Sequence, residues 1–155
     1  MNFQIKGFKS WNTDDGGGYQ FNLYLDGKKF AYVHNDGNGG CIDMKFYDLK
    51  FMGGQYSWDE SPSAITWNKY VKSLGQWKSS FGVTSNGTEW FDHDTETAIG
   101  ILVEDYEMSK YRKKGILFKL LTDGEGTFRT IKTQDMDLAV NQLDKTFGKG
   151  KYELV

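Results

Sequence analysis

The sequence predicts an α+β fold in which an antiparallel β meander and a hairpin pack against two to three helices. Apolar and polar residues alternate over the first fifty residues, as they do in half-buried strands. Apolar residues then recur at steps of three and four between Ser61 and Lys114, which is the period of a helix facing a core. A length of 155 residues with 16% aromatic residues suits one domain spanning 1–155, with enough apolar area to fold alone.

Four strands are expected in the first fifty residues, and the dipeptide Asp26-Gly27 between the second and third is typical of a tight hairpin turn. Because side chains alternate between the two faces of a strand, the apolar residues of the second strand should share one face and point at the helices. The residues that mark the four strands are Phe3, Ile5 and Phe8; Phe21, Leu23 and Leu25; Phe30, Tyr32 and Val33; and Ile42, Met44, Phe46 and Tyr47.

Two helices are expected in the middle of the chain. Ser61-Pro62 is a favourable helix start, because a proline in the first turn loses no needed hydrogen bond. A second helix is expected over about 95–114, where basic residues in the last turn oppose the helix dipole and Gly115 ends the helix. The apolar stripes are Ile65, Trp67, Val71, Leu74, Trp77 and Phe81 in the first helix and Ala98, Ile101, Leu102, Tyr106 and Tyr111 in the second.

A hairpin and a third helix complete the predicted order ββββααββα. The hairpin comprises a strand over 116–121, a turn over 122–126 and a partner strand over 127–133. The helix opens near Asp135, carries Leu138, Val140 (or Ala139), Leu143 and Phe147, and ends at Gly148. Residues 151–155 form either a closing strand or a frayed tail.

Charge and hydropathy argue against two classes of partner. A formal net charge of −2 lacks the basic footprint of a nucleic-acid binder, so we expect no nucleic-acid partner. No stretch approaches the ~18 apolar residues of a membrane span, and the first residues lack the apolar run of a signal peptide. The single cysteine, Cys41, cannot close an internal disulfide, which favours a reducing compartment. We therefore expect a cytoplasmic protein with no membrane association.

Two glycine-rich segments, 12–18 and 34–40, are the most unusual feature of the sequence. They follow the first and third strands, and alternate connections of a meander lie at the same end of the sheet, so both should share one rim. Glycines let backbone amides approach a ligand closely and hold an anion. Segment 34–40 is therefore either a binding loop for a small anionic ligand or a long, flexible hairpin connection. The candidate binding residues are His34, Asp36, Asn38, Gly39 and Gly40, with Asp14 and Asp15 in the other segment.

Segment 34–40 matches none of three common ligand-binding motifs. No Gly-Lys-Ser/Thr follows it, as a P-loop requires. A strand rather than a helix comes next, which excludes the dinucleotide-binding fingerprint. As a calcium loop it would have His34 as its first ligand and Lys45 as its twelfth, and neither suits calcium.

The carboxylates and the thiol elsewhere in the sequence give weaker signals. Asp14 and Asp15 either pair around a metal or mark a flexible turn. Cys41 lacks a local catalytic signature and is interpreted as a small strand residue. Two histidines and one cysteine do not make a typical zinc site, so we predict no metal, no cofactor and no catalytic residue.

His93 lies between Asp92 and Asp94, and a carboxylate beside a histidine can orient it for acid–base chemistry. Adjacent residues rarely face each other, however, and Asp94 or Thr95 is better explained as a helix N-cap.

Charge is also uneven in this part of the chain. Seven acids and no base lie within 81–109, whereas five bases and no acid lie within 110–119. This pattern indicates either compensation of the helix dipole or an acidic surface for a protein partner.

The chain resembles a family of small proteins of bacteriophages and prophages. The resemblance is carried by residues 21–31 and 36–40 and, in the later hairpin, by 113–120 and 126–130, which together cover about a fifth of the chain. The family carries no established activity that the resemblance could imply. It often has a cysteine near the position of Gly115, and this chain does not. The resemblance implies a phage accessory protein that acts in the bacterial cytoplasm.

We predict a non-enzymatic binding protein, which the resemblance refines to a phage-encoded modulator of a host protein or defence system. Glycine-rich loops, many aromatic residues and an acidic stretch favour a host or phage protein as the partner. The alternative is a protein that binds or sequesters a small molecule or nucleotide through the loops of the rim. A small enzyme is the third possibility.

Overall fold

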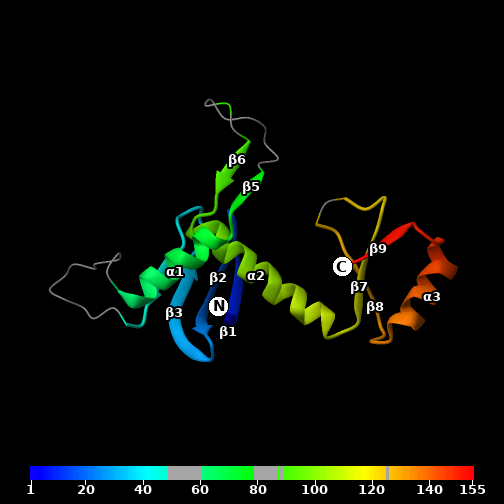
Figure 1. Cartoon of the computed structure of the whole chain (residues 1–155), viewed down its shortest axis with the longest axis horizontal. Helices are drawn as coiled ribbons and strands as arrows, with labels where there is room; N and C mark the ends of the chain where they lie inside the picture. Colours follow the sequence, from blue (N-terminus) through cyan, green and yellow to red (C-terminus); the bar gives the residue numbers. More distant parts are fainter. Residues whose placement is uncertain (49–60, 79–86, 88, 125) are drawn as a thin grey trace. The chain divides into compact units, whose positions relative to one another are not determined.

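The computed structural model describes residues 1–48, 61–78, 87, 89–124 and 126–155 and confirms the predicted α+β class (Figure 1). Four antiparallel strands come first, followed by helices that alternate with short strands. The elements are β1 (Phe3–Thr13), β2 (Gly16–Leu25), β3 (Lys28–Asn35), β4 (Asp43–Phe46), α1 (Pro62–Ser73), β5 (Gln76–Lys78), β6 (Trp90–Asp92), α2 (Thr95–Arg112), β7 (Ile116–Leu120), β8 (Arg129–Ile131), α3 (Met136–Phe147) and β9 (Tyr152–Leu154).

The chain divides into two compact units, Met1–Val103 and Glu104–Val155, and the division falls within α2. The first unit contains the four-stranded sheet, α1 and the hairpin of β5 and β6. The second contains the three-stranded sheet and α3. Two compact units can belong to one domain or to two, so a single domain over 1–155 stays a prediction.

The four-stranded sheet is an antiparallel meander in the order β1-β2-β3-β4. The Asp26-Gly27 turn joins β2 to β3, and its φ angles of 48° and 82° are both positive, as the predicted tight hairpin requires. β1 carries a bulge between Lys6 and Lys9, so that Phe8 returns to the same face as Phe21 and stacks on it.

One face of this sheet, which we call the inner face, packs against α1 and the first turns of α2. Phe21 and Leu23 are fully buried there and Leu25 packs at the edge of the same cluster, which confirms the predicted orientation. From the helices, Trp67, Ala98 and Ile99 complete the core, all with no measurable exposure. Figure 1 shows α1 and the beginning of α2 lying across the strands.

α1 begins where the sequence predicts but ends earlier. The Ser61 hydroxyl accepts a hydrogen bond of 3.0 Å from the amide of Ala64 and caps the helix. Gly75 follows the helix with a φ of 75°, and Trp77 then lies in β5 rather than on the predicted helical stripe. The apolar period alone could not reveal this break, because Trp77 fits both patterns. Phe81, predicted as the end of the stripe, lies outside the described residues.

Two loop assignments also differ from expectation. Gly16–Gly18 belong to β2 and pair with β1, so the connection between these strands is only Asp14-Asp15. Cys41 is exposed in the loop before β4 and is not the strand residue that the sequence predicts. In α2, Ile99 is buried although it lies outside the predicted stripe, whereas Tyr111 of that stripe is exposed.

The second unit is built on β7, which pairs antiparallel with β8 on one side and with β9 on the other. Residues 152–154 are therefore a closing strand, which settles the alternative between a strand and a frayed tail. Leu117, Phe118, Ala139 and Leu143 form the buried apolar residues of this unit. The carboxylate of Asp135 caps α3 by accepting a hydrogen bond from the amide of Leu138.

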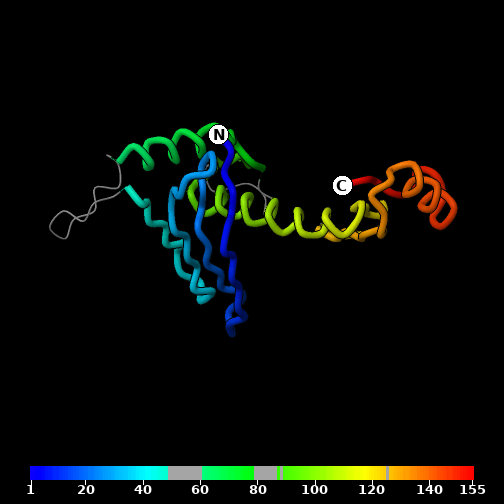
Figure 2. Tube along the Cα trace, turned by 90° about the horizontal axis from the view of Figure 1, so that it is seen from below, coloured from blue at the N-terminus to red at the C-terminus, as the bar shows by residue number. Residues whose placement is uncertain are grey.

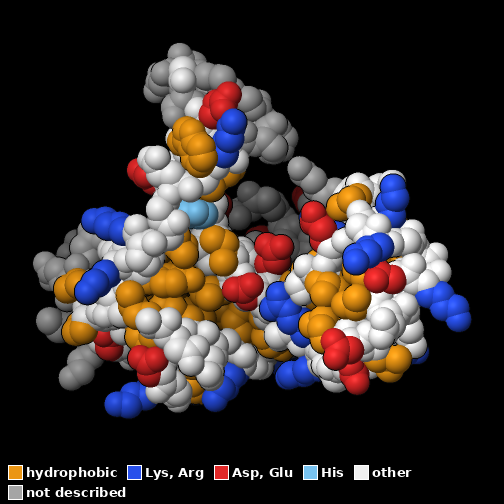
Figure 3. Space-filling view, turned by 45° about the vertical axis from the view of Figure 1, so that its right-hand side comes forward, with side chains coloured by type: hydrophobic (Ala, Val, Ile, Leu, Met, Phe, Trp, Pro, Cys, Tyr) orange, Lys and Arg blue, Asp and Glu red, His pale blue; other side chains and the backbone are white. Residues whose placement is uncertain are grey.

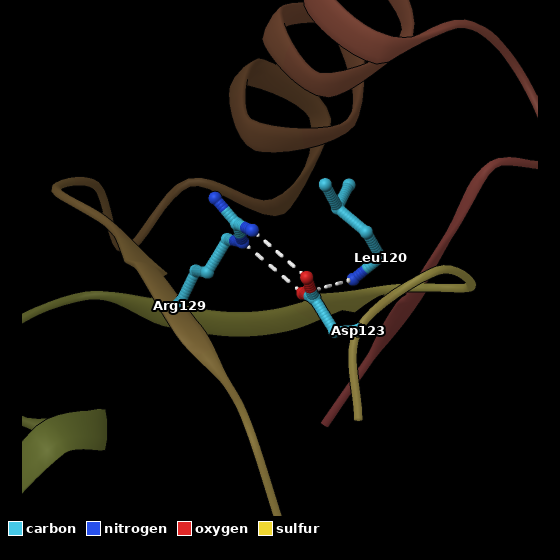
Figure 4. Close-up of polar contacts among 3 residues, drawn as sticks. All are labelled: Leu120, Asp123 and Arg129. Atoms are coloured by element: carbon cyan, nitrogen blue, oxygen red, sulfur yellow. Dashed lines mark hydrogen bonds and ion pairs between the residues drawn. The ribbon is translucent and has the colours of Figure 1, made fainter. Parts of the chain in front are cut away.

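The β7–β8 loop is closed by a charged pair. Asp123 accepts two hydrogen bonds from the guanidinium of Arg129, at 2.8 and 3.1 Å, and one of 2.9 Å from the amide of Leu120 (Figure 4). The hydrogen bonds from Arg129, followed by that from Leu120, lower the pKa of Asp123 to about 2.

Among the described residues, no helix is long and apolar enough to cross a membrane.

Candidate functional site

The two glycine-rich segments meet at one end of the four-stranded sheet, as the meander predicts (Figure 2). We call this end the rim and define it as Asp14, Asp15 and residues 36–40. The Thr13 hydroxyl donates a hydrogen bond of 2.6 Å to the carbonyl of Gly37, and the Trp11 indole donates one of 3.2 Å to the carbonyl of Asp36. The loop over 36–40 is therefore held by direct contacts with the end of β1.

Close backbone packing explains two of the glycines at the rim. A Cβ atom on Gly37 would lie 2.5 Å from the amide nitrogen of Gly18, and Gly37 also has a φ of 80°. A Cβ atom on Gly18 would overlap the Trp11 indole and lie 2.8 Å from the carbonyl oxygen of Asp36. These glycines allow the loop over 36–40 to approach the start of β2, so they have a structural role that requires no ligand.

Two amides of the rim loop, those of Gly37 and Asn38, have partners within the loop and the end of β3. The Asn35 side chain accepts a hydrogen bond of 2.8 Å from the amide of Gly37, and Asp36 accepts one of 2.9 Å from the amide of Asn38. Three carboxylates, those of Asp14, Asp15 and Asp36, are exposed at the same end. An anion would therefore meet negative charge there, which argues against a small anionic ligand at the rim itself.

The remaining predicted site residues divide between the loop and the sheet. Asn38, Gly39 and Gly40 are exposed in the loop, and a Cβ atom on Gly39 would meet nothing within 4 Å. His34, in contrast, is half-buried on β3, and its ring centroid lies 5.7 Å from that of Trp11 and 6.5 Å from that of Tyr32. His34 thus belongs to an aromatic cluster on the sheet rather than to the loop over 36–40.

This cluster is one corner of the sheet's outer face, the face opposite to the helices. The register aligns its side chains in rows across the strands because directly paired residues point to the same side. One row is Lys9, Gln20, His34 and Asp43; the next is Lys6, Asn22, Tyr32 and Lys45; the third is Gln4, Tyr24 and Lys29. Trp11 lies on the same face above Gly18, and Tyr47 follows β4 with its hydroxyl hydrogen-bonded to Asn22.

The outer face combines aromatic rings with positive charge. Four lysines and one aspartate leave these rows with a formal charge of +3, in a chain whose net charge is −2. Two of the lysines lie over tyrosine rings, Lys6 at 4.4 Å from the centroid of Tyr24 and Lys29 at 5.5 Å from that of Tyr47. The face therefore offers flat π surfaces and cations side by side.

The inner side of the rim is tied to α2. The amide of Ile42 donates a hydrogen bond of 3.3 Å to the carboxylate of Glu96 in the first turn of the helix. Burial raises the pKa of the nearby Tyr19 hydroxyl, and the negative charge of Glu96 adds to this effect. These contacts hold the loop before β4 on the core side of the sheet, and they do not involve the side chains of the outer face.

His93 lies just before α2, away from the rows of the outer face. The Asp94 carboxylate accepts a 2.8 Å hydrogen bond from the amide of Thr97, which lowers the pKa of Asp94 and caps the helix as predicted. The amide of His93 donates to the carbonyl of Gly75 at 3.5 Å, and its Nδ1 is buried with no hydrogen-bond partner among the described atoms. That His93 has no catalytic role stays a prediction.

The second unit holds a pocket of about 630 Å³ that the sequence did not predict. Its lining combines Glu104, Glu107 and Met108 of α2 with Phe128 and Glu153, among others. Figure 3 shows apolar side chains bordered by both acidic and basic ones on this unit. Glu153 is paired with Lys119 at 3.0 Å, whereas Glu104 and Glu107 belong to the acidic stretch that the sequence marks as a possible protein-binding surface.

Sequence reasoning found the rim but missed the outer face. The signal was present as the polar half of each alternating strand, yet only the strand register shows that these residues form one surface.

Comparisons with protein-family models, with curated proteins and with solved structures find no match to this chain. Within the part of the chain that the structure describes, no group of three or more His, Cys, Asp or Glu residues is placed to hold a metal ion.

Proposed function

We propose that this chain is a non-enzymatic binding protein whose binding surface is the outer face of the four-stranded sheet. The observation that carries the proposal is the alignment of Trp11, Tyr32 and His34 beside rows of lysines and amides on the face that the core does not use. Aromatic rings supply large contact area at a low cost in conformational entropy, and cations select the partner by charge. The partner that this surface suits is a macromolecule with negative charge.

The resemblance to phage and prophage proteins supports a more specific role. In this role the chain is a phage-encoded modulator that acts in the bacterial cytoplasm on a host protein or on a component of host defence. The partner can equally be a phage protein. In either case the lysines of the outer face would set the rate of association through long-range attraction, and the rings would hold the partner once it is in contact.

A pull-down from bacterial lysate tests the proposal with two variants of equal charge change. Lys9→Glu/Lys45→Glu reverses two exposed lysines of the outer face, and Lys69→Glu/Lys72→Glu reverses two exposed lysines of α1. We expect the wild type and the α1 variant to retain the same partner and the outer-face variant to lose it. Equal retention by all three proteins would remove the outer face as the binding surface.

The pocket of the second unit favours a second candidate function, the binding of a basic protein segment. Glu104 and Glu107 supply negative charge, and Tyr111 and Phe128, whose ring centroids are 5.0 Å apart, supply an aromatic wall. A lysine or arginine side chain would meet both features. Glu104→Gln/Glu107→Gln should then weaken retention of a basic partner, and unchanged retention would exclude this candidate.

A further inference from the structure

We infer that the partner of the outer face is single-stranded nucleic acid, with bases stacking on Trp11, Tyr32 and His34 and phosphates meeting the surrounding lysines. This inference rests on the outer face as the proposed binding surface, and it replaces a host or phage protein with nucleic acid as the partner of that face.

The three rings, which we call the platform, lie next to one another, and each residue is partly accessible. Tyr32 and His34 have ring planes only 17° apart, and the plane of Trp11 is inclined by 34° to that of His34. Exposed rings on an antiparallel sheet can stack on nucleobases that are not paired in a duplex, and every base offers a π face for such contact. A duplex hides these faces inside its stack, so the platform favours a single strand.

The charge around the platform complements a phosphate backbone. Lys9 lies in the same row as His34, and Lys6 and Lys45 lie in the same row as Tyr32 on opposite sides of it. A strand that crosses the sheet along the Tyr32 row would therefore meet cations on both sides of that ring, whereas along the His34 row it would meet Lys9 on one side and Asp43 on the other. The acidic rim lies beyond Trp11 and would confine the phosphates to the rows of lysines.

Amide side chains between the rings and the lysines can hydrogen-bond to base edges. Gln20 lies between Lys9 and His34, and Asn22 lies between Lys6 and Tyr32. The Gln20 carbonyl accepts a hydrogen bond of 3.1 Å from the Tyr32 hydroxyl, which orients the amide and leaves its NH2 group available as a donor. Such contacts would give modest base preference on top of stacking.

The expectation of no nucleic-acid partner came from the net charge of the whole chain, −2. Nucleic acid responds to the charge of the surface that it contacts, and the rows of the outer face carry +3. Apart from Asp43, many of the acidic residues that lower the total lie outside these rows, including Asp14, Asp15 and Asp36 at the rim and Glu104, Glu107 and Glu153 in the second unit.

Fluorescence anisotropy with a labelled 12-nucleotide oligo(dT) tests the inference on the full chain. We expect wild type and Lys69→Glu/Lys72→Glu to bind the oligonucleotide equally, and Lys9→Glu/Lys45→Glu to bind at least tenfold more weakly. Neutralising Lys9 alone with glutamine should reduce the slope of log affinity against log salt by roughly 0.7, the value for one phosphate contact of a single strand. The same oligonucleotide annealed to its complement should bind more weakly than the single strand.

The ring platform has its own pair of variants. Tyr32→Leu should weaken oligonucleotide binding by about fivefold or more, because it removes one stacking surface. Tyr32→Phe keeps the ring and loses only the hydroxyl, and it should bind nearly as the wild type does. Equal affinity of all three proteins would overturn the stacking mode.

A parallel binding measurement with polyglutamate distinguishes a nucleic-acid partner from an acidic protein partner. If polyglutamate binds as tightly as the oligonucleotide and Tyr32→Leu changes neither, the surface selects charge alone and the inference is wrong. If the oligonucleotide does not bind but the outer-face variant still loses its partner from nuclease-treated lysate, the inference fails while the proposed function stands. If neither ligand nor lysate partner depends on the outer face, both fail.

Discussion

The two faces of the four-stranded sheet are formed by the same strands, but one face packs in the core and the other is open to solvent. On the inner face Leu23, Ala31 and Val33 have no measurable exposure and pack against α1 and α2. On the outer face the residues that alternate with them in sequence, including Asn22, Tyr32 and His34, remain partly accessible. Core packing therefore constrains only every second residue of these strands. The other residues are available to form a binding surface.

Leu23→Asp should have the largest effect on stability, since it places an unpaired carboxylate in the core of the first unit. We expect a loss of roughly 3–5 kcal/mol in the free energy of unfolding, measured by urea titration. The matched control is Asn22→Asp one position earlier, which keeps the acceptor for the Tyr47 hydroxyl and should change stability by about 0.5 kcal/mol or less. Similar losses in the two variants would mean that the faces do not differ as described.

Gly37→Ala tests the close contact between the loop over 36–40 and the start of β2. The new methyl would press on the backbone of Gly18, and we expect a loss of about 1–3 kcal/mol. Gly39→Ala is the control, because Gly39 has a similar φ of 78° but open space around its Cα. It shares the backbone strain without the contact, so it should cost less. If the two variants were equally destabilised, the contact would add nothing to the strain.

The Asp123 carboxylate of the second unit, whose side chain is only 9% exposed, contrasts with the exposed lysines of the outer face because its hydrogen bonds are made within the fold. The pKa of Asp123 is lowered from 3.8 to about 2 in the folded chain. Its contribution to stability is therefore complete above about pH 4 and is lost as the pH falls toward 2. Asp123→Asn should be less stable than wild type at pH 5 and should lack this part of the acid dependence. Urea midpoints between pH 5 and pH 2 measure both, and parallel pH profiles would contradict the role of the pair.

Lys9→Glu/Lys45→Glu should have the smallest effect on the fold. Both side chains are exposed on the outer face, so the free energy of unfolding should change by about 1 kcal/mol or less. Thermal unfolding beside Lys69→Glu/Lys72→Glu provides the measurement. A large loss confined to the outer-face variant would show that these lysines stabilise the sheet.

The sequence predicted the inner face well because alternation is a local signal. Phe21, Leu23 and Leu25 could be assigned to the core from their spacing alone, and Asp26-Gly27 fixed the hairpin between two of the strands. The break after α1 could not be predicted, since Trp77 continues the helical period across Gly75 and only the pairing of β5 with β6 shows that it is a strand residue.

The candidate site was predicted only in part, for a different reason. That the two glycine-rich segments meet follows from the order of a meander, but that Gly18 and Gly37 serve each other depends on contacts across the sheet. The outer face depends on register over long separations, because Lys9, Gln20, His34 and Asp43 form one row although they come from four strands. No local pattern contains that alignment.

The central claim is that the outer face binds a partner but does not stabilise the fold. Its most direct test compares single preparations of wild type and Lys9→Glu/Lys45→Glu. Each preparation is divided between thermal unfolding and retention of the lysate partner. We predict that the unfolding midpoint stays within a few degrees of wild type while retention is lost. Retention at the wild-type level by a folded variant would contradict the assignment of the binding surface to the outer face.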